Sequence, residues 1–189
     1  TMRRSIKMLV GFVCALALFS GCQTGSGAES LPTFAQEAPA EDSAVHTVQE
    51  FIDAIKPNAT VTLPSGSLVL SDGSDQPINN PYCKWEWGTL VISNVDGLTI
   101  RGSGMDSTTL ETEPRWANVI TLDNCDNVTL KDFTAGHTKD KPGECSGGVL
   151  KLIDCRNTQM EGLGLFGCGV VGVNAESCRN LELKQCRIY

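Results

Sequence analysis

The sequence is poor in aromatic residues, in histidines and in long apolar runs. Aromatic side chains make up 6% of its 189 residues, which favours thin, repetitive packing over large aromatic clusters. It has two histidines, His46 and His137, and no Cys-x-x-Cys pair, so no metal site is expected. The apolar run at 8–19 is far shorter than the ~20 residues that a membrane-spanning helix needs. Metal coordination and a helical span are therefore not expected functions.

Positive charge is also scarce. The formal net charge is -7 at pH 7, although Arg3, Arg4 and Lys7 lie together in an N-terminal stretch that has no acidic residue. The rest of the chain therefore carries about -10. A surface this acidic repels phosphate backbones, so no nucleic-acid partner is expected. The length suits one domain with a hydrophobic core.

The N-terminus has the pattern of an export signal. Basic residues, the apolar run and the small residues Ser20 and Gly21 predict a signal peptide at 1–21; a short uncut anchor is the alternative. The segment Leu18–Cys22 resembles the lipobox of bacterial lipoproteins, although Phe19 replaces the usual leucine. The resemblance implies cleavage before Cys22, lipidation of Cys22, and anchoring to the bacterial cell membrane or envelope with the domain on the extracytoplasmic side.

Residues 22–45 are rich in Gly, Ser, Ala, Pro and Glu, which predicts a lipidated, flexible linker. A helix is predicted at 47–56, with Thr47 as N-cap and Glu50 closing a capping box. Apolar residues then follow helical spacing until Pro57 ends the pattern. Amphipathic helices of this kind cover the open end of a solenoid.

The remaining chain repeats a pattern of alternating aliphatic residues around a short polar turn. One glycine and three asparagines mark the turn at intervals of 30, 30 and 23 residues: Gly97, Asn127, Asn157 and Asn180. Both residue types tolerate positive φ, so a sharp turn is expected at each marker. A 23-residue period of short strands is typical of a β-solenoid. Each 30-residue interval then holds about seven extra residues, which the spacing assigns to 103–114 and 136–144, on one shared edge.

Several segments carry a family resemblance: Asn80–Tyr82, Leu98–Gly102, Glu113–Ala117, Gly136–Thr138 and Cys145–Leu150. They resemble segments of bacterial right-handed parallel β-helix repeat proteins, in the pectin-lyase-like superfamily. The resemblance covers 48–189 and implies an all-β, right-handed parallel β-helix over 46–189, with coils from about residue 60. The chain stops inside a coil, so a C-terminally truncated sequence is expected.

The cysteines form columns in this repeat. Cys125, Cys155 and Cys178 each stand two residues before a marker, and Cys145 and Cys168 form a second column. Neighbouring coils lie about 4.8 Å apart, so the columns are either ladders of buried thiols or disulfides.

The candidate site residues lie in and beside the two insertions, apart from Trp85 on the first coil. The catalytic candidates are Glu113, Arg115, His137, Asp140 and Glu144, and the binding candidates are Trp116, Lys139 and Trp85. The resemblance implies either a lyase, with a basic residue and a calcium ion, or a hydrolase with two carboxylates. Arg115 and His137 also have structural interpretations. Arg115 can stack on Trp116 and hold the loop, and His137 can bind a loop carbonyl.

The expected function is binding of a polysaccharide or envelope glycan along the elongated face. The alternatives are a polysaccharide lyase or glycoside hydrolase, and a non-catalytic structural or adhesive spacer that contacts other proteins. A monomer is expected. Calcium is implied only by the resemblance, because no calcium-binding motif is present.

Overall fold

The computed structural model describes residues 42–139, 141, 143–167 and 171–189. The predicted signal peptide, the lipidation residue Cys22 and most of the linker lie outside the described residues. Ordered structure begins before the expected boundary at residue 46, because Asp42–Ala44 forms a strand, β1. Asp42 accepts hydrogen bonds from Thr62 and Arg101, at 2.8 and 2.6 Å. These long-range contacts hold a segment whose composition predicts a linker.

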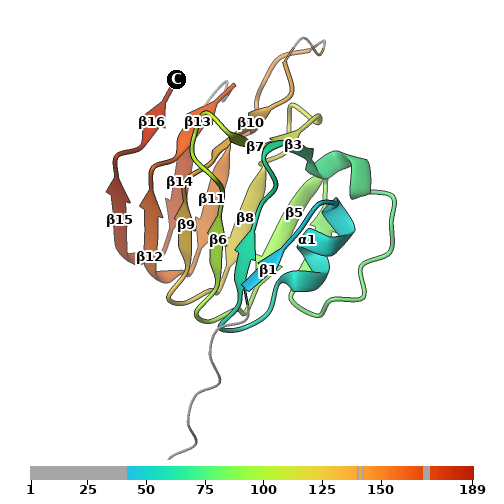
Figure 1. Ribbon diagram of the computed structural model, residues 1–189. Coiled ribbons are helices and arrows are strands. Elements are labelled where there is room, and N and C mark those ends of the chain that lie inside the picture. The colour runs from blue at the N-terminus through green and yellow to red at the C-terminus, as the bar shows by residue number, and fades with distance from the viewer. Residues whose placement is uncertain (1–41, 140, 142, 168–170) are drawn as a thin grey trace, which may run out of the picture. The chain divides into compact units, whose positions relative to one another are not determined.

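The described residues form three mainly parallel sheets, which lie side by side around a common interior (Figure 1). Sheet A contains β1, β2 (Thr60–Thr62), β6 (Thr99–Arg101), β9 (Thr129–Lys131), β12 (Arg156–Glu161) and β15 (Arg179–Lys184). Sheet B contains β3 (Gly66–Val69), β7 (Thr108–Thr112), β10 (Thr134–His137), β13 (Gly164–Phe166) and β16 (Arg187–Ile188). Sheet C contains β4 (Cys83–Glu86), β5 (Thr89–Ser93), β8 (Ile120–Asp123), β11 (Leu150–Ile153) and β14 (Val173–Glu176).

From β5 onward the chain visits sheets C, A and B in turn and then repeats the circuit. Along sheet C, Leu90 is in register with Ile120, Ile120 with Leu150, and Leu150 with Val173. These registers reproduce the predicted intervals of 30, 30 and 23 residues. The predicted all-β class with parallel sheets is therefore confirmed, and the arrangement is compatible with a β-solenoid. The pair β4 and β5 is antiparallel and ends sheet C.

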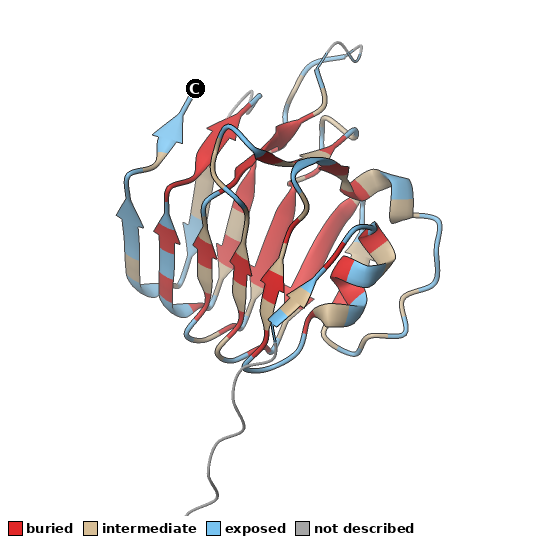
Figure 2. Cartoon of the chain, in the orientation of Figure 1, coloured by how far each residue is buried: buried red, intermediate tan, exposed pale blue. Residues whose placement is uncertain are grey.

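The hydrophobic core lies between the three sheets and is lined by the buried residues of the inner coils, whereas β14, β15 and β16 of the last coil contain no buried residue (Figure 2). Each sheet contributes a column of aliphatic side chains from successive coils. In sheet A these include Ile100, Leu130 and Met160, which are in register and fully buried. In β7 and β11, buried residues alternate with partly exposed ones, as the two-residue period of β structure requires.

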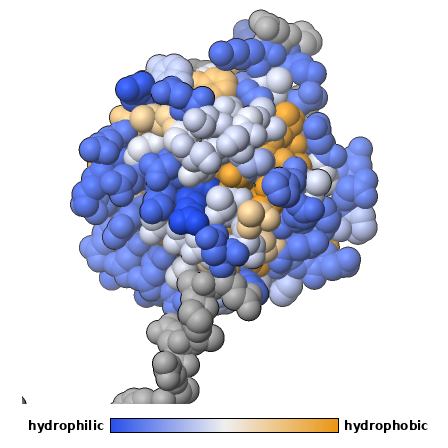
Figure 3. Space-filling view, in the orientation of Figure 1, coloured by the Kyte–Doolittle hydropathy of each residue, from blue (hydrophilic) through white to orange (hydrophobic). Residues whose placement is uncertain are grey.

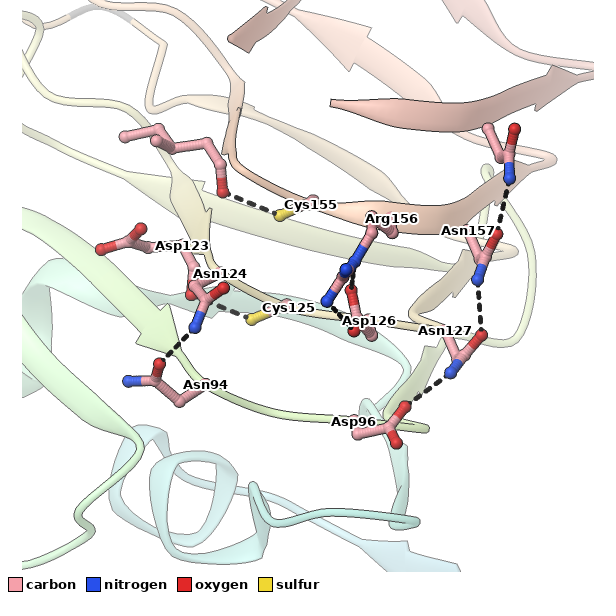
Figure 4. Close-up of polar contacts among 12 residues, drawn as sticks. Asn94, Asp96, Asp123, Asn124, Cys125, Asp126, Asn127, Cys155, Arg156 and Asn157 are labelled. Atoms are coloured by element: carbon pink, nitrogen blue, oxygen red, sulfur yellow. Dashed lines mark hydrogen bonds and ion pairs between the residues drawn. The ribbon is translucent and has the colours of Figure 1, made fainter. Parts of the chain in front are cut away.

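A regular turn, here called the ladder corner, joins sheet C to sheet A. The four marker residues Gly97, Asn127, Asn157 and Asn180 all have positive φ, as predicted, with values of 74, 53, 54 and 55°. The side-chain amides of the three asparagines form a chain of hydrogen bonds across coils. Asn180 donates to Asn157 at 2.9 Å, Asn157 to Asn127 at 3.0 Å, and Asn127 to Asp96 at 2.6 Å (Figure 4). The residue that tolerates the turn thus also links the coils.

Helix α1 (Val48–Ala54) covers the end of the stack formed by the first strands (Figure 1). The hydroxyl of Thr47 accepts from the Glu50 amide at 3.1 Å, as the capping box predicts. The Glu50 carboxylate accepts from the amide of His46 rather than from that of Thr47. The helix is shorter than the expected 47–56, because Ile55 already has an extended backbone. Phe51 and Ile52 bury its apolar face in the core.

The placement of the insertions on one shared edge is wrong for the first insertion. Thr99 pairs with Thr129 of the next coil, and Thr109 pairs with Thr134. Thr99 and Thr109 are ten residues apart in the chain, whereas their partners are five apart. Five of the seven inserted residues therefore lie before β7. Only two of them follow β7. All seven residues of the second insertion follow β10 and precede β11. The spacing of the marker residues gives only the total number of extra residues in each coil. It could not show that β7 divides the first insertion.

The six cysteines in the described part of the chain are free. Cys125 and Cys155 are fully buried in the predicted column, and each sulfur lies 3.3–3.5 Å from backbone carbonyl oxygens. On β4, burial and, to a lesser degree, Asp53 raise the pKa of the Cys83 thiol to about 12. Described cysteines of the first column therefore form the ladder of thiols rather than disulfides, whereas Cys168 of the second column lies outside the described residues.

Candidate functional site

The most promising site is a recess on the outer face of sheet B. It has a volume of about 450 Å³ and is lined by Arg115, His137, Lys139, Phe166, Gly167 and Tyr189. A second hollow of about 410 Å³ adjoins it and shares Lys139, Phe166 and Tyr189. The loops that follow β7 and β10 form one wall, here called the loop corner, where the chain passes from sheet B to sheet C. The second insertion, at 136–144, therefore contributes to the site.

An aromatic pair forms the floor of the recess. Phe166, at the end of β13, lies against Gly136 of β10, where even a Cβ atom would come within 2.6 Å of the ring. Tyr189 stacks on Phe166 with ring centroids 6.4 Å apart and an angle of 23° between the rings. The ammonium of Lys139 lies 5.7 Å from the Phe166 centroid, within cation–π range. Sequence reasoning missed both aromatic residues, because only the register between coils brings them together.

Arg115 lies in the turn after β7 and connects the two loops of the loop corner. Its carbonyl accepts from the amides of Ser146 and Gly147, at 3.0 and 2.7 Å. A Cβ on Gly147 would collide with the backbone of Ala117, so glycine allows this close approach. The Nε of Arg115 is buried and has no hydrogen-bond partner among the described residues. This unsatisfied donor belongs to a side chain that lines the recess.

His137, the last residue of β10, is buried with 2% exposure. Its Nδ1 lies 2.9 Å from the Gly167 carbonyl oxygen, and its Nε2 lies 2.9 Å from that of Ala117. The interpretation that His137 binds loop carbonyls is confirmed. The ring is thus held between the two chain segments that carry these carbonyls.

The two predicted carboxylates that the structure describes, Glu113 and Glu144, do not line the recess. Glu113 is exposed and pairs with Lys141, at 2.7 Å between Oε1 and Nζ. Glu144 is exposed as well. Asp140 lies outside the described residues, so its pairing with Glu113 as two hydrolase carboxylates stays a prediction.

The three predicted binding residues lie in different environments. Lys139 lines the recess. Trp116 is 69% exposed and its Nε1 donates to the Trp87 carbonyl at 3.2 Å. Trp87 is itself 88% exposed. Trp85 instead packs against the core, as the alternation along β4 would have indicated.

The face of the molecule that is turned to the viewer in Figure 1 is mostly polar. Figure 3 shows a mostly hydrophilic face, on which apolar side chains form only a narrow band. Within the described residues, no group of three or more His, Cys, Asp or Glu side chains could hold a metal ion. No helix in that part of the chain is long and apolar enough to cross a membrane.

Searches against protein-family models, curated proteins and solved structures find no match for this chain. The site therefore has to be interpreted from its own geometry and chemistry.

Proposed function

We propose that residues 42–189 form a right-handed parallel β-helix that binds an acidic polysaccharide in the recess on sheet B. The observation that carries this proposal is the combination of two cations, Arg115 and Lys139, with the aromatic pair Phe166 and Tyr189 in one recess. Aromatic faces stack on the C–H faces of sugar rings, and Arg and Lys bind carboxylates. Uronate-containing chains present both features.

Charge supports this choice of ligand. The protein carries a net charge of -7, yet the side chains named in this recess include two cations and no carboxylate. A cationic site on an acidic protein draws anions locally, while the remaining surface repels nonspecific ones. The buried, unsatisfied Nε of Arg115 adds a donor that a ligand oxygen would satisfy.

The exposed indoles of Trp87 and Trp116 extend the proposed binding surface. The hydrogen bond from Trp116 to the Trp87 backbone ties the two turns together. Arg115 lines the recess, and Trp116 is the next residue. A linear polymer that leaves the recess at Arg115 would therefore meet these indoles.

Binding without catalysis is favoured over the lyase and hydrolase alternatives. His137 has both ring nitrogens engaged by carbonyl oxygens, and Glu113 is engaged by Lys141. Arg115 remains the candidate base for a lyase, and incubation of the protein with a bound polymer tests it by the appearance of new chain ends. A protein-contacting spacer is the remaining alternative.

A glycan array with the full-length chain, with and without calcium, tests the proposal. Selective binding of uronate-rich polymers is expected. Lys139→Ala should weaken binding about tenfold, the equivalent of one charge-assisted contact. Lys151→Ala is the matched control, because Lys151 pairs with Glu176 on sheet C, 3.2 Å away. A blank array from folded protein would favour the spacer instead.

We further propose that the protein is exported and anchored through a lipid on Cys22. Support comes from the basic residues, the apolar run and the segment Leu18–Cys22. Cys22→Ala should move the protein from the membrane fraction to the soluble extract of bacteria that express it. Unchanged membrane association of that variant would contradict lipidation at this residue.

A further inference from the structure

A thiol and an imidazole lie together beside the recess. The Sγ of Cys145 is 3.3 Å from His137 Nδ1 and 2.7 Å from the carbonyl oxygen of Gly167. Cys145 is half-buried, whereas Cys125 and Cys155 are fully buried. His137 and Gly167 both line the recess, so the two groups that Cys145 contacts also face its interior.

The protons of this pair are constrained by its neighbours. Both nitrogens of His137 face carbonyl oxygens at 2.9 Å, those of Gly167 and Ala117. A neutral imidazole has one N–H, whereas an imidazolium donates from both nitrogens. The Cys145 thiol donates to the Gly167 carbonyl and lies 3.3 Å from Nδ1 of the ring, so His137 is placed to take up its proton when the sulfur reacts. Thiolates are the reactive form of cysteine, and nearby cations stabilise them.

We propose that Cys145 is a nucleophilic thiol, paired with His137, that reacts preferentially with small anionic electrophiles. Lys139 and Arg115 supply the selectivity, because both line the adjoining recess and carry positive charge. The site is a modification site for carboxylate-bearing alkylating or acylating groups. The proposal does not depend on glycan binding.

The chemistry is a simple displacement. The thiolate sulfur forms a bond to the electrophilic carbon, and the bond from that carbon to its leaving group breaks, so that the leaving group departs with the electron pair. The proton that the thiol lost stays on His137 and passes to solvent. No oxidant or further reactant is required.

Other cysteines provide an internal reference. Cys186 is half-buried like Cys145, but its sulfur contacts the carbonyl oxygens of Met160 and Lys184. Cys125 is sealed in the core and reports on unfolding, since labelling there requires the domain to open.

The test is site-resolved alkylation of the reduced full-length chain with iodoacetate, which is anionic, and with iodoacetamide, which is neutral. Peptide mass spectrometry gives the rate at each cysteine. Both rates at one cysteine are proportional to its thiolate fraction, so their ratio does not depend on that fraction. Lys139→Ala should lower this ratio at Cys145 by about threefold, because one nearby cation is lost. Lys151→Ala should leave the ratio unchanged.

His137→Gln should slow Cys145 with both reagents by about tenfold while leaving Cys186 unaffected. Faster labelling of Cys125 would show that the His137→Gln variant is unfolded. In that case the test of the proposal is the ratio of the iodoacetate rate to the iodoacetamide rate at Cys145 in Lys139→Ala. The proposal is overturned if Lys139→Ala leaves the ratio at Cys145 unchanged, or if folded His137→Gln leaves both Cys145 rates unchanged. Because the readout is alkylation, a blank glycan array leaves it intact.

Discussion

The ladder corner and the loop corner belong to the same coils, but the chain turns in a different way at each of them. At the ladder corner every coil uses a residue with positive φ, and asparagine amides bond to the coil beside them. At the loop corner the connections differ in length from coil to coil, and Arg115, His137 and Cys145 meet there. Regular turns thus join the coils, while irregular loops bring reactive and charged side chains together.

The largest difference is expected in stability. Asn157→Ala removes the central amide of the ladder and places alanine at φ 54°. Loss of two hydrogen bonds and a strained backbone should cost about 2 kcal/mol in the free energy of unfolding. Urea unfolding measures the change.

Glu113→Ala is the matched substitution at the loop corner. It breaks only the exposed pair with Lys141, so it should cost less than about 0.5 kcal/mol. Equal costs for the two variants would remove the distinction between the corners.

A smaller difference in stability is expected between serine variants of the two cysteine columns. Cys155→Ser buries a hydroxyl at a site with no exposure and should destabilise the fold by about 1 kcal/mol. Cys145→Ser should change the stability less, because Cys145 is half-buried, while removing the proposed nucleophile. Thermal unfolding of both variants, side by side, checks the order, and a reversed order would contradict it.

The smallest effect concerns an exposed ion pair at the ladder corner. The pKa of Asp126 is lowered by hydrogen bonds from Arg156, at 2.9 and 2.7 Å, and by its charge (Figure 4). A depressed folded-state pKa adds stability above the unfolded value of about 3.9, and this stability is lost as the pH falls through the folded value. Asp126→Asn should therefore lower the melting temperature slightly at pH 7 and by less at pH 2. A constant difference across this range would contradict the assignment.

Prediction from the sequence succeeded where structure repeats. The spacing of Gly97, Asn127, Asn157 and Asn180 predicted both the register and the sign of φ, because each marker obeys the same local backbone preference. The capping box at Thr47 was predicted for the same reason. The linker was predicted to extend to residue 45, yet Asp42–Ala44 pairs with β2. Nothing in its composition favours a strand, and contacts with Thr62 and Arg101 hold it there.

The candidate site was predictable only in part. Arg115, His137 and Lys139 were identified from the insertions, and the structure brings them together. Trp85 was predicted to bind a ligand, although alternation along β4 directs its side chain inward. Phe166 and Tyr189 were missed, since their stacking over Gly136 depends on the alignment of three coils.

The sequence by itself determined the period of the repeat, the positive-φ turns and the side chains of the inner coils that form the core. These features depend on backbone preferences and side-chain alternation that act over a few residues and recur along the chain. Only the tertiary structure decided that β7 divides the first insertion, that two cations share a recess with two aromatic rings, and that Cys145 lies against His137. Those contacts depend on how each loop folds over neighbouring coils, which local preferences do not specify.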